Sequence, residues 1–350
     1  MTARHVRWAA AVAILAAWAP AGAATAAPVT VTGWPAVEAA LGGGTLAWAT
    51  TATNRLRGFS YWSTEVSTVR LGRTGPSGAA TSPVAVRTQA GPFGPVGLTA
   101  GADGSVVLVA RGRGFAPPVV WCCDTRGLEV VMHSDGRAGA ARALAAAVDG
   151  PRVRMVLAAA SGATLVGEDP RRLTDEQEAL AGALPRVEAA FPGTPVEGLV
   201  AASGPLLAWV DAADPAAVRT GTVTDAGLAE GTPLPTGARV RGVWVEAPST
   251  VVVASGTSAV TLTRHDLAGG TRRVVWRGAG VPRVAVGGGV VAVASGRAVS
   301  AGRGALRPLR TAAGEVAAVA TDGRRVAAFE RIVRRGGKRA TVMRLLAVTG

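Results

Sequence analysis

Short apolar runs recur along the chain, and each is introduced by a tight turn rich in glycine or Asp-Gly. In chain order these turns and runs are Gly43-Gly44 before TLAWAT, Asp103-Gly104 before SVVLVA, Asp149-Gly150 before PRVRMVLA, Ser203-Gly204 before PLLAWV, Pro248-Ser249 before TVVVAS, Gly288-Gly289 before VVAVAS and Asp322-Gly323 before RRVAAFE. Val-rich runs of this length favour strands that are buried on both faces. Asp-Gly and Gly-Gly supply the positive φ that type I′ hairpin turns require. The pattern therefore predicts an all-β protein built from repeated hairpins.

The repeats are evenly spaced. Gly44 and Gly323 lie 279 residues apart and enclose six intervals, a mean of about 46 residues. Blades of β-propellers contain roughly 40 to 50 residues. A single sheet with two apolar faces cannot bury both, whereas radial packing of successive sheets buries them all. We expect a seven-bladed β-propeller, with six or eight blades also compatible with the spacing. A β-sandwich or two smaller β domains is the alternative.

Three repeat segments carry a resemblance to known proteins: GLTAGADGSVVLVARG, EVAAVATDGRRVAAFE and RVAVGGGVVAVASG. They resemble the strand-Asp-Gly-strand units of secreted bacterial β-propellers with WD40-like and TolB-like repeats. The similarity covers nearly all of residues 36–350. It implies the propeller fold, and the motif itself marks turns without specifying an activity.

The first 26 residues have the pattern of a secretory signal peptide. Arg4, His5 and Arg7 precede the apolar run Trp8–Trp18, and small residues follow up to Ala26. We expect cleavage after Ala26 and a secreted, extracytoplasmic chain, residues 27–350, that forms a single domain. The apolar run is shorter than the roughly 20 residues of a membrane span. No later apolar run is long enough, so we expect no membrane span after cleavage.

The start of the mature chain is predicted to complete the last blade. The final repeat contains three strands before the chain ends, and the alternating stretch Val29–Thr32 precedes the first repeat. We expect residues 27–35 to supply the missing strand, because such closure removes an exposed sheet edge.

Two segments depart from the repeat. The sequence TDEQEALAGALPRVEAAF starts with a capping box, Thr174 with Gln177, and predicts a helical excursion near residues 174–190. Its helix is expected from Asp175 to about Leu184 and is ended by Pro185. Residues 72–95, rich in Gly, Pro, Ser and Thr, predict a long loop between blades.

Composition agrees with this fold. The chain contains 47 Gly and only 17% charged residues, whereas soluble domains average about 7% Gly and about 25% charged residues. Many tight turns and strands buried between sheets account for both departures. The same values exclude a coiled coil and a charged disordered chain.

The charge is strongly positive. The formal net charge is +14 and becomes +12 without the two arginines of the signal peptide. In a propeller, the loops between second and third strands share a rim with the loops that join blades. Among the cations there, we select as a candidate anion-binding face Arg55, Arg57, Arg111, Arg113, Arg334, Arg335 and Lys338. The expected partner is an anionic polymer or an acidic protein surface, and a solvated basic face is the alternative. Nucleic acid is disfavoured because only 4% of residues are aromatic.

The only cysteines, Cys122 and Cys123, are adjacent in a predicted strand. We consider a vicinal disulfide between them, which an exported protein favours although the linkage requires a distorted peptide. Two reduced buried thiols, an intermolecular bridge and half of a metal site remain as alternatives. No His or Cys lies at ligand spacing from the pair.

Catalytic motifs are absent from the sequence, which contains three histidines. His133 and His265 have no local second ligand, so we interpret them as structural or surface residues. Four carboxylates follow second strands and are the candidates for acid-base chemistry: Asp211, Asp214, Glu246 and Glu330. We expect a monomeric binding or scaffold protein without cofactor or metal. The alternative is an extracytoplasmic hydrolase or lyase with its site at the mouth of the propeller channel.

Overall fold

A computed structural model gives the structure of the chain. It describes residues 29–31, 36–55, 63–73, 84–90, 95–100, 106–110, 119–123, 129–133, 142–149, 152–159, 162–168 and 186–348. All regular elements in these ranges are strands, and the ranges contain no helix. The all-β prediction is confirmed.

The strands form antiparallel sheets in which consecutive strands are hydrogen-bonded neighbours, and the ranges described group into seven such sheets. The first sheet contains β2 (Ala36–Gly42), β3 (Thr45–Arg55), β4 (Ser63–Arg73) and β5 (Val84–Ala90). The second contains β6 (Pro95–Ala100), β7 (Val106–Ala110), β8 (Val119–Cys123) and β9 (Glu129–His133). The third contains β10 (Arg142–Asp149), β11 (Arg152–Ala159), β12 (Gly162–Glu168) and β13 (Arg186–Phe191).

The remaining sheets lie in the continuously described part of the chain. They contain β14 (Pro195–Ser203), β15 (Leu206–Asp211), β16 (Asp214–Thr224) and β17 (Gly227–Glu230), with β18 (Leu234–Pro235) paired to β16; β19 (Val240–Glu246), β20 (Thr250–Gly256), β21 (Ala259–Asp266) and β22 (Thr271–Ala279); β23 (Arg283–Gly287), β24 (Val290–Ser295), β25 (Ala298–Gly302) and β26 (Arg307–Thr311); β27 (Glu315–Thr321), β28 (Arg325–Val333) and β29 (Arg339–Ala347), with β1 (Val29–Val31).

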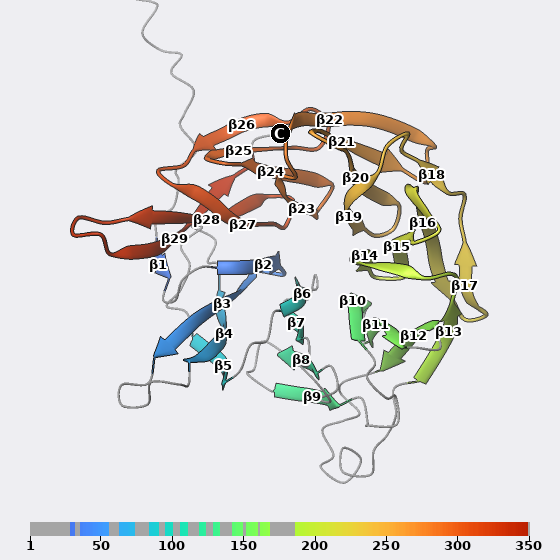
Figure 1. Ribbon diagram of the computed structural model, residues 1–350, viewed down its shortest axis with the longest axis horizontal. Helices are drawn as coiled ribbons and strands as arrows, with labels where there is room; N and C mark the ends of the chain where they lie inside the picture. Colours follow the sequence, from blue (N-terminus) through green and yellow to red (C-terminus); the bar gives the residue numbers. More distant parts are fainter. Residues whose placement is uncertain are drawn as a thin grey trace, which may run out of the picture.

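The sheets are arranged radially around a centre (Figure 1). One edge strand of each sheet is innermost and contacts the innermost strands of both neighbouring sheets. Their cyclic order is β2, β6, β10, β14, β19, β23, β27 and back to β2. We call these the inner strands. Because this cycle is complete, the sheets form a closed ring.

The ring closes through strands from both ends of the chain. β1 pairs antiparallel with β29, and Val29, Thr30 and Val31 lie opposite Met343, Val342 and Thr341. The sheet order β1-β29-β28-β27 therefore places an N-terminal strand at the outer edge of the last sheet.

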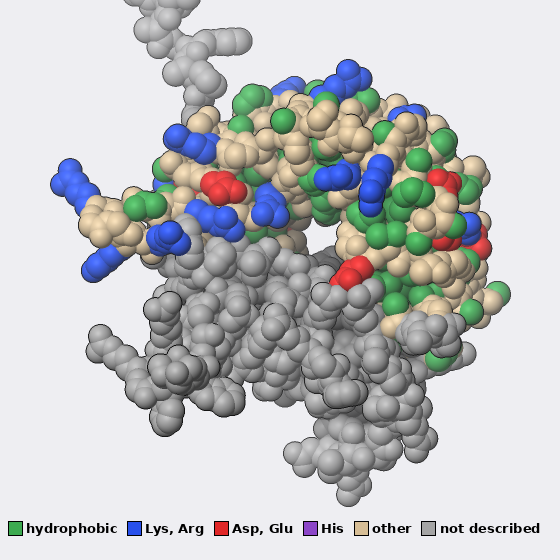
Figure 2. All heavy atoms as spheres, in the orientation of Figure 1, with side chains coloured by type: hydrophobic (Ala, Val, Ile, Leu, Met, Phe, Trp, Pro, Cys, Tyr) green, Lys and Arg blue, Asp and Glu red, His purple; other side chains and the backbone are tan. Residues whose placement is uncertain are grey.

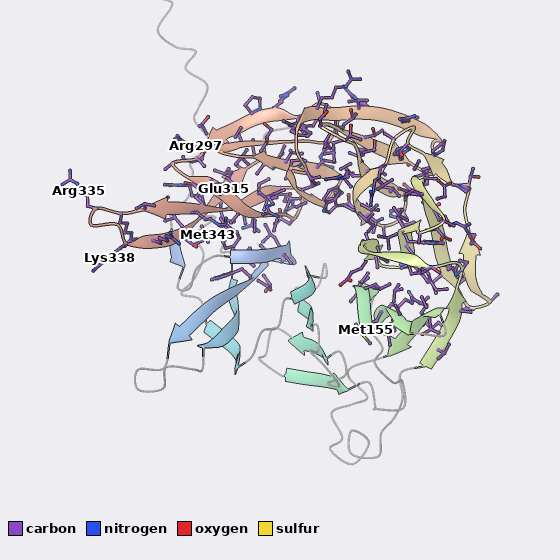
Figure 3. The ribbon with its side chains drawn as sticks, viewed as in Figure 1. Met155, Arg297, Glu315, Arg335, Lys338 and Met343 are labelled. Carbon is purple, nitrogen blue, oxygen red and sulfur yellow. The ribbon has the colours of Figure 1, made fainter. Side chains whose placement is uncertain are left out.

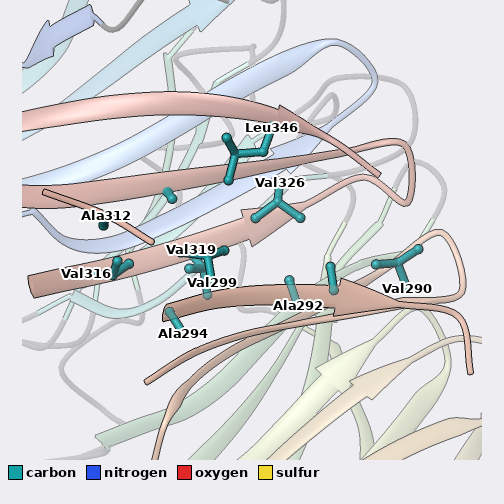
Figure 4. Close-up of a cluster of buried hydrophobic side chains, with 11 residues drawn as sticks. Val290, Ala292, Ala294, Val299, Ala312, Val316, Val319, Val326 and Leu346 are labelled. Carbon is teal, nitrogen blue, oxygen red and sulfur yellow. The ribbon is translucent and has the colours of Figure 1, made fainter. Parts of the chain in front are cut away.

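Apolar side chains fill the spaces between neighbouring sheets. Trp48 of β3 and Phe329 of β28 are fully buried, with ring centroids 5.8 Å apart. In the next interface, short side chains of β24 such as Ala292 and Ala294 pack in one cluster with residues of β27 and β28, among them Val319 of β27 (Figure 4). Short residues on facing strands let the two sheets approach closely, so the sheets are held mainly by apolar burial.

The turns between first and second strands also touch. Gly323 has a φ of +85°, and a Cβ built there would lie 2.5 Å from the Cα of Gly288, whose φ is +57°. Glu246 adds a contact between sheets, because its two carboxylate oxygens accept the N–H of Gly289 at 2.8 and 3.1 Å. Glycine is required at Gly323 by conformation and by space.

The repeat units predicted the strands well, and two segments differ from expectation. Each of the seven apolar runs named above is the second strand of its sheet. Residues 72–95 are not a continuous loop, because β5 completes the first sheet there by pairing with β4. Likewise, residues 186–190 of the expected helical excursion belong to β13, which pairs with β12. The expected helix at 175–184 lies outside the described residues, as does the expected signal peptide.

Candidate functional site

Charge is distributed unevenly around the ring. Residues 195–235, which hold β14–β18, contain five acidic residues and one arginine, whereas residues 283–311, which hold β23–β26, contain five arginines and no acidic residue. Figure 2 shows the acidic side chains gathered largely over β14–β17 and the basic ones over the sheets from β19 to β29. The described part of the ring therefore has an acidic sector and a broad basic sector.

The hairpin between β28 and β29 is the most cationic feature of the basic sector. Residues 333–339, which we call the cationic hairpin, include the exposed side chains of Arg334, Arg335, Lys338 and Arg339. The turn is closed by hydrogen bonds from the N–H of Arg334 to Lys338 O (2.8 Å) and from the N–H of Gly337 to Arg334 O (3.1 Å). The hairpin projects beyond the ring, with Arg335 and Lys338 pointing away from it (Figure 3).

The base of this hairpin is fixed by a buried carboxylate. Glu330 of β28 is fully buried, and its Oε1 lies 2.9 Å from Nε of Arg344 and 3.3 Å from Nε of Arg310. Neither Nε has the angle of a hydrogen bond to Glu330, so we treat both contacts as ion pairs. The other oxygen, Oε2, accepts the N–H of Ala313 at 3.2 Å. Glu330 therefore links the hairpin strands to β26 of the neighbouring sheet.

The predicted anion-binding face is only partly described. Arg334, Arg335 and Lys338 lie together on the cationic hairpin. Arg55 ends β3, where the backbone alone is described, and Arg57, Arg111 and Arg113 lie outside the described residues. The face as a whole stays a prediction. The structure describes the geometry of the part of this face that lies on the cationic hairpin.

The ring encloses a central cavity of about 620 Å³. Its lining comes largely from the inner strands β2, β10, β14, β19, β23 and β27, and most of the lining side chains are Ala, Val, Leu or Gly. Trp244 supplies an aromatic ring. Arg283, the first residue of β23, is the one ionisable side chain that the described residues contribute to the lining.

The four candidate carboxylates lie apart from this cavity, and each makes local contacts. Asp211 and Asp214 are register partners at the β15–β16 turn. Asp211 accepts the N–H of Ala213 at 3.0 Å, and Asp214 accepts the N–H of Ala216 at 3.2 Å. Glu246 ends the inner strand β19 and Glu330 lies within β28, so the expectation that they follow second strands is wrong for these two. Both make the backbone contacts already described. The four carboxylates therefore stabilise turns and contacts between sheets, and they are absent from the described lining of the cavity.

His265 of β21 is a buried histidine. Its Nε2 has no hydrogen-bond partner among the described residues. Burial, and secondarily the charge of Arg272, lowers the pKa of His265 from its usual 6.5. The adjacent Asp266 accepts a hydrogen bond from the hydroxyl of Ser249 at 2.9 Å, and this bond lowers the pKa of Asp266. The environment of His265 favours a neutral, structural side chain.

Cys122 and Cys123 end β8, as expected from the sequence. They lie opposite Val107 and Val106 of β7 in a regular register. Their redox state stays a prediction, as does the role of His133, which ends β9. In the described ranges, no three His, Cys, Asp or Glu residues form a group able to hold a metal, and no helix could cross a membrane.

The closed ring of radially packed antiparallel sheets makes this chain a β-propeller. Neither a protein-family model nor a curated protein matches its sequence. Solved propellers match its fold. A puromycin hydrolase is 15% identical with a TM-score of 0.56, over 92% of this chain and 52% of the hydrolase.

Two further structures show how widely this fold is shared. The β-propeller domain of Myceliophteria thermophila Cps50 (Swd1) is 12% identical with a TM-score of 0.55, over 93% of this chain and 99% of that domain. PorZ, a bacterial surface component of the type-IX secretion system of Porphyromonas gingivalis, is 10% identical with a TM-score of 0.52, over 89% of this chain and 38% of PorZ. This chain thus spans about half of the hydrolase and little over a third of PorZ. At these identities the likeness concerns the fold alone, which a hydrolase and a secretion-system component share.

Proposed function

We propose that this protein is a non-catalytic binding propeller that recognises an anionic partner, either an anionic polymer or an acidic protein surface, through the cationic hairpin. The observation that carries the proposal is the projecting hairpin, where four exposed cations surround a tight turn. Guanidinium groups suit carboxylate and phosphate groups. The exposed Val333, with 70% of its surface accessible, adds an apolar contact beside them.

The surrounding charges support the same surface. The neighbouring β23–β26 sheet carries arginines without acidic residues, so the field around the hairpin is positive and would attract an anionic partner from a distance. The rigid base also contributes, because the Glu330 ion pairs hold β28 and β29 in place. A preorganised hairpin loses less entropy on binding.

Retention on immobilised poly-L-glutamate tests the proposal, using the chain that starts at residue 27. Wild-type protein should elute at a defined salt concentration, because its contacts with the polymer are ionic. The double variant Arg335→Gln/Lys338→Gln should elute at clearly lower salt. Its matched control is Arg272→Gln/Arg273→Gln. This variant removes the same charge from two exposed residues near the start of β22, away from the cationic hairpin.

Two outcomes would refute the proposal. Retention that does not depend on salt would remove its electrostatic basis. Equal losses in the two double variants would show that net charge, and not the hairpin, determines retention.

We also propose that the protein is exported, because residues 1–26 have the pattern of a cleaved signal peptide. N-terminal sequencing of the protein recovered from its native compartment should read Ala27 first. An N-terminus that retains residues 1–26 would contradict this proposal.

A further inference from the structure

The central cavity is distinct from the cationic hairpin, and its lining is suited to a small ligand. We propose that it binds a small organic carboxylate with an apolar body, whose carboxylate is held by Arg283. The proposal concerns a second site and does not rest on the function of the hairpin.

The cavity has the size of a ligand site. Its volume of about 620 Å³ falls within the range of about 300 to 1,000 Å³ typical of small-molecule pockets. The space stays open because inner strands carry short side chains, such as Ala39, Ala146, Ala201 and Ala317. Their methyl groups leave room that larger residues would fill.

The side chains of the lining are mainly apolar, and the main chain supplies most of its polar groups. Val200, Val245 and Val286 come from three different inner strands, and Trp244 adds an aromatic face. Each inner strand also ends its sheet and has a partner strand on one side only. Main-chain N–H and C=O groups along the free edges can therefore accept or donate hydrogen bonds inside the cavity. Such a lining favours an apolar ligand body with one polar end.

Arg283 determines which chemical group the polar end of the ligand should carry. Its side chain is exposed, and among the described residues no hydrogen bond or ion pair engages it. The buried Pro282 and the half-exposed Val281 precede it and also line the cavity. A guanidinium at the cavity can form two parallel hydrogen bonds with the carboxylate of a ligand. Among the described lining residues, this single cation matches one carboxylate.

Calorimetric titration of the chain from residue 27 tests this inference. The probes are 4-phenylbutyrate, 1-naphthoate and decanoate, each compared with the corresponding neutral alcohol. We expect at least one acid to bind with a stoichiometry of one and at least tenfold more tightly than its alcohol. Arg283→Gln should abolish that preference. Val281→Glu should weaken the acid at least tenfold, because the new carboxylate pairs with Arg283 and repels the ligand.

Arg277→Gln is the matched control, since Arg277 is an exposed arginine of the outer strand β22 outside the cavity lining. It should bind the acid like wild type. The inference is overturned if none of the three acids binds, if Arg283→Gln retains full affinity, or if Arg277→Gln loses as much as Arg283→Gln. Retention of Arg283→Gln on poly-L-glutamate separates the two sites, because it should match that of Arg277→Gln, which removes the same charge, whether or not the hairpin proposal holds.

Discussion

The buried carboxylate of Glu330 should be worth far more to stability than a similar carboxylate at the surface. Glu330 is 0% exposed, while its partners Arg344 and Arg310 are 22% and 30% exposed. Glu330→Gln keeps the side-chain shape and removes the charge. Breaking a buried ion pair costs about 3 to 5 kcal/mol when the remaining charge stays buried. Because both arginines partly reach solvent, we expect a loss of about 3 kcal/mol, the lower end of that range.

The same sheet offers a matched control. Glu315 pairs with Arg331 at 3.5 Å, but its side chain is 59% exposed. Surface pairs contribute about 0 to 1 kcal/mol, so Glu315→Gln should cost less than about 1 kcal/mol. Urea unfolding at pH 7 measures both variants, provided that their m-values equal that of wild type. If Glu330→Gln costs no more than Glu315→Gln, burial does not set the value of the pair and the reasoning is wrong.

Three other perturbations test separate parts of the fold. Gly323→Ala should lower the free energy of unfolding, measured in urea, by about 2 to 4 kcal/mol, because the positive φ and a backbone clash both cost energy. The control Gly336→Ala, at a φ of +82° with open space around it, should cost only about 1 to 2 kcal/mol. Equal losses in the two variants would contradict the clash. His265 has a lowered pKa, so its contribution to stability should be complete above pH 6.5 and fall as the pH drops from there towards the folded-state pKa; His265→Leu should remove that part of the pH dependence, and an unchanged profile would argue against it. Deleting residues 27–33 from the mature chain removes β1 and should lower the melting temperature by several degrees, whereas an unchanged value would show that the outer edge needs no closing strand.

Much of the fold was predictable because short stretches of the sequence determine its strands and turns. Each second strand is a short apolar run after a tight turn, and runs such as PLLAWV and VVAVAS became the fully or largely buried strands β15 and β24. A strand buried between two sheets needs apolar residues on both faces, so its signal is strong in the sequence. Outer strands have one face towards solvent and lose that signal. The outer strands β5 and β13 lie where the sequence predicts a loop and part of a helical excursion.

The candidate site was less predictable. The cations of the hairpin at residues 334–338 could be listed from the sequence, but their projection beyond the ring depends on the lengths of β28 and β29. Arg283 gave no separate signal, because many arginines precede strands in this chain. Its place at a cavity follows from the position of β23 as an inner strand. The same holds for Glu330, which the sequence offered as a catalytic candidate and which proved to be a buried link between sheets.

The sequence by itself determined the all-β class, the repeat and the excess of positive charge, since turn chemistry, burial on both faces and net charge are properties of neighbouring residues or of simple sums. Only the tertiary structure decided which charges stand together and which are neutralised. It divided the described ring into an acidic and a basic sector, buried Glu330 between two arginines and left Arg283 at the central cavity. Those placements depend on contacts between residues far apart in the chain. Closing the ring fixes these contacts, and no local pattern encodes them.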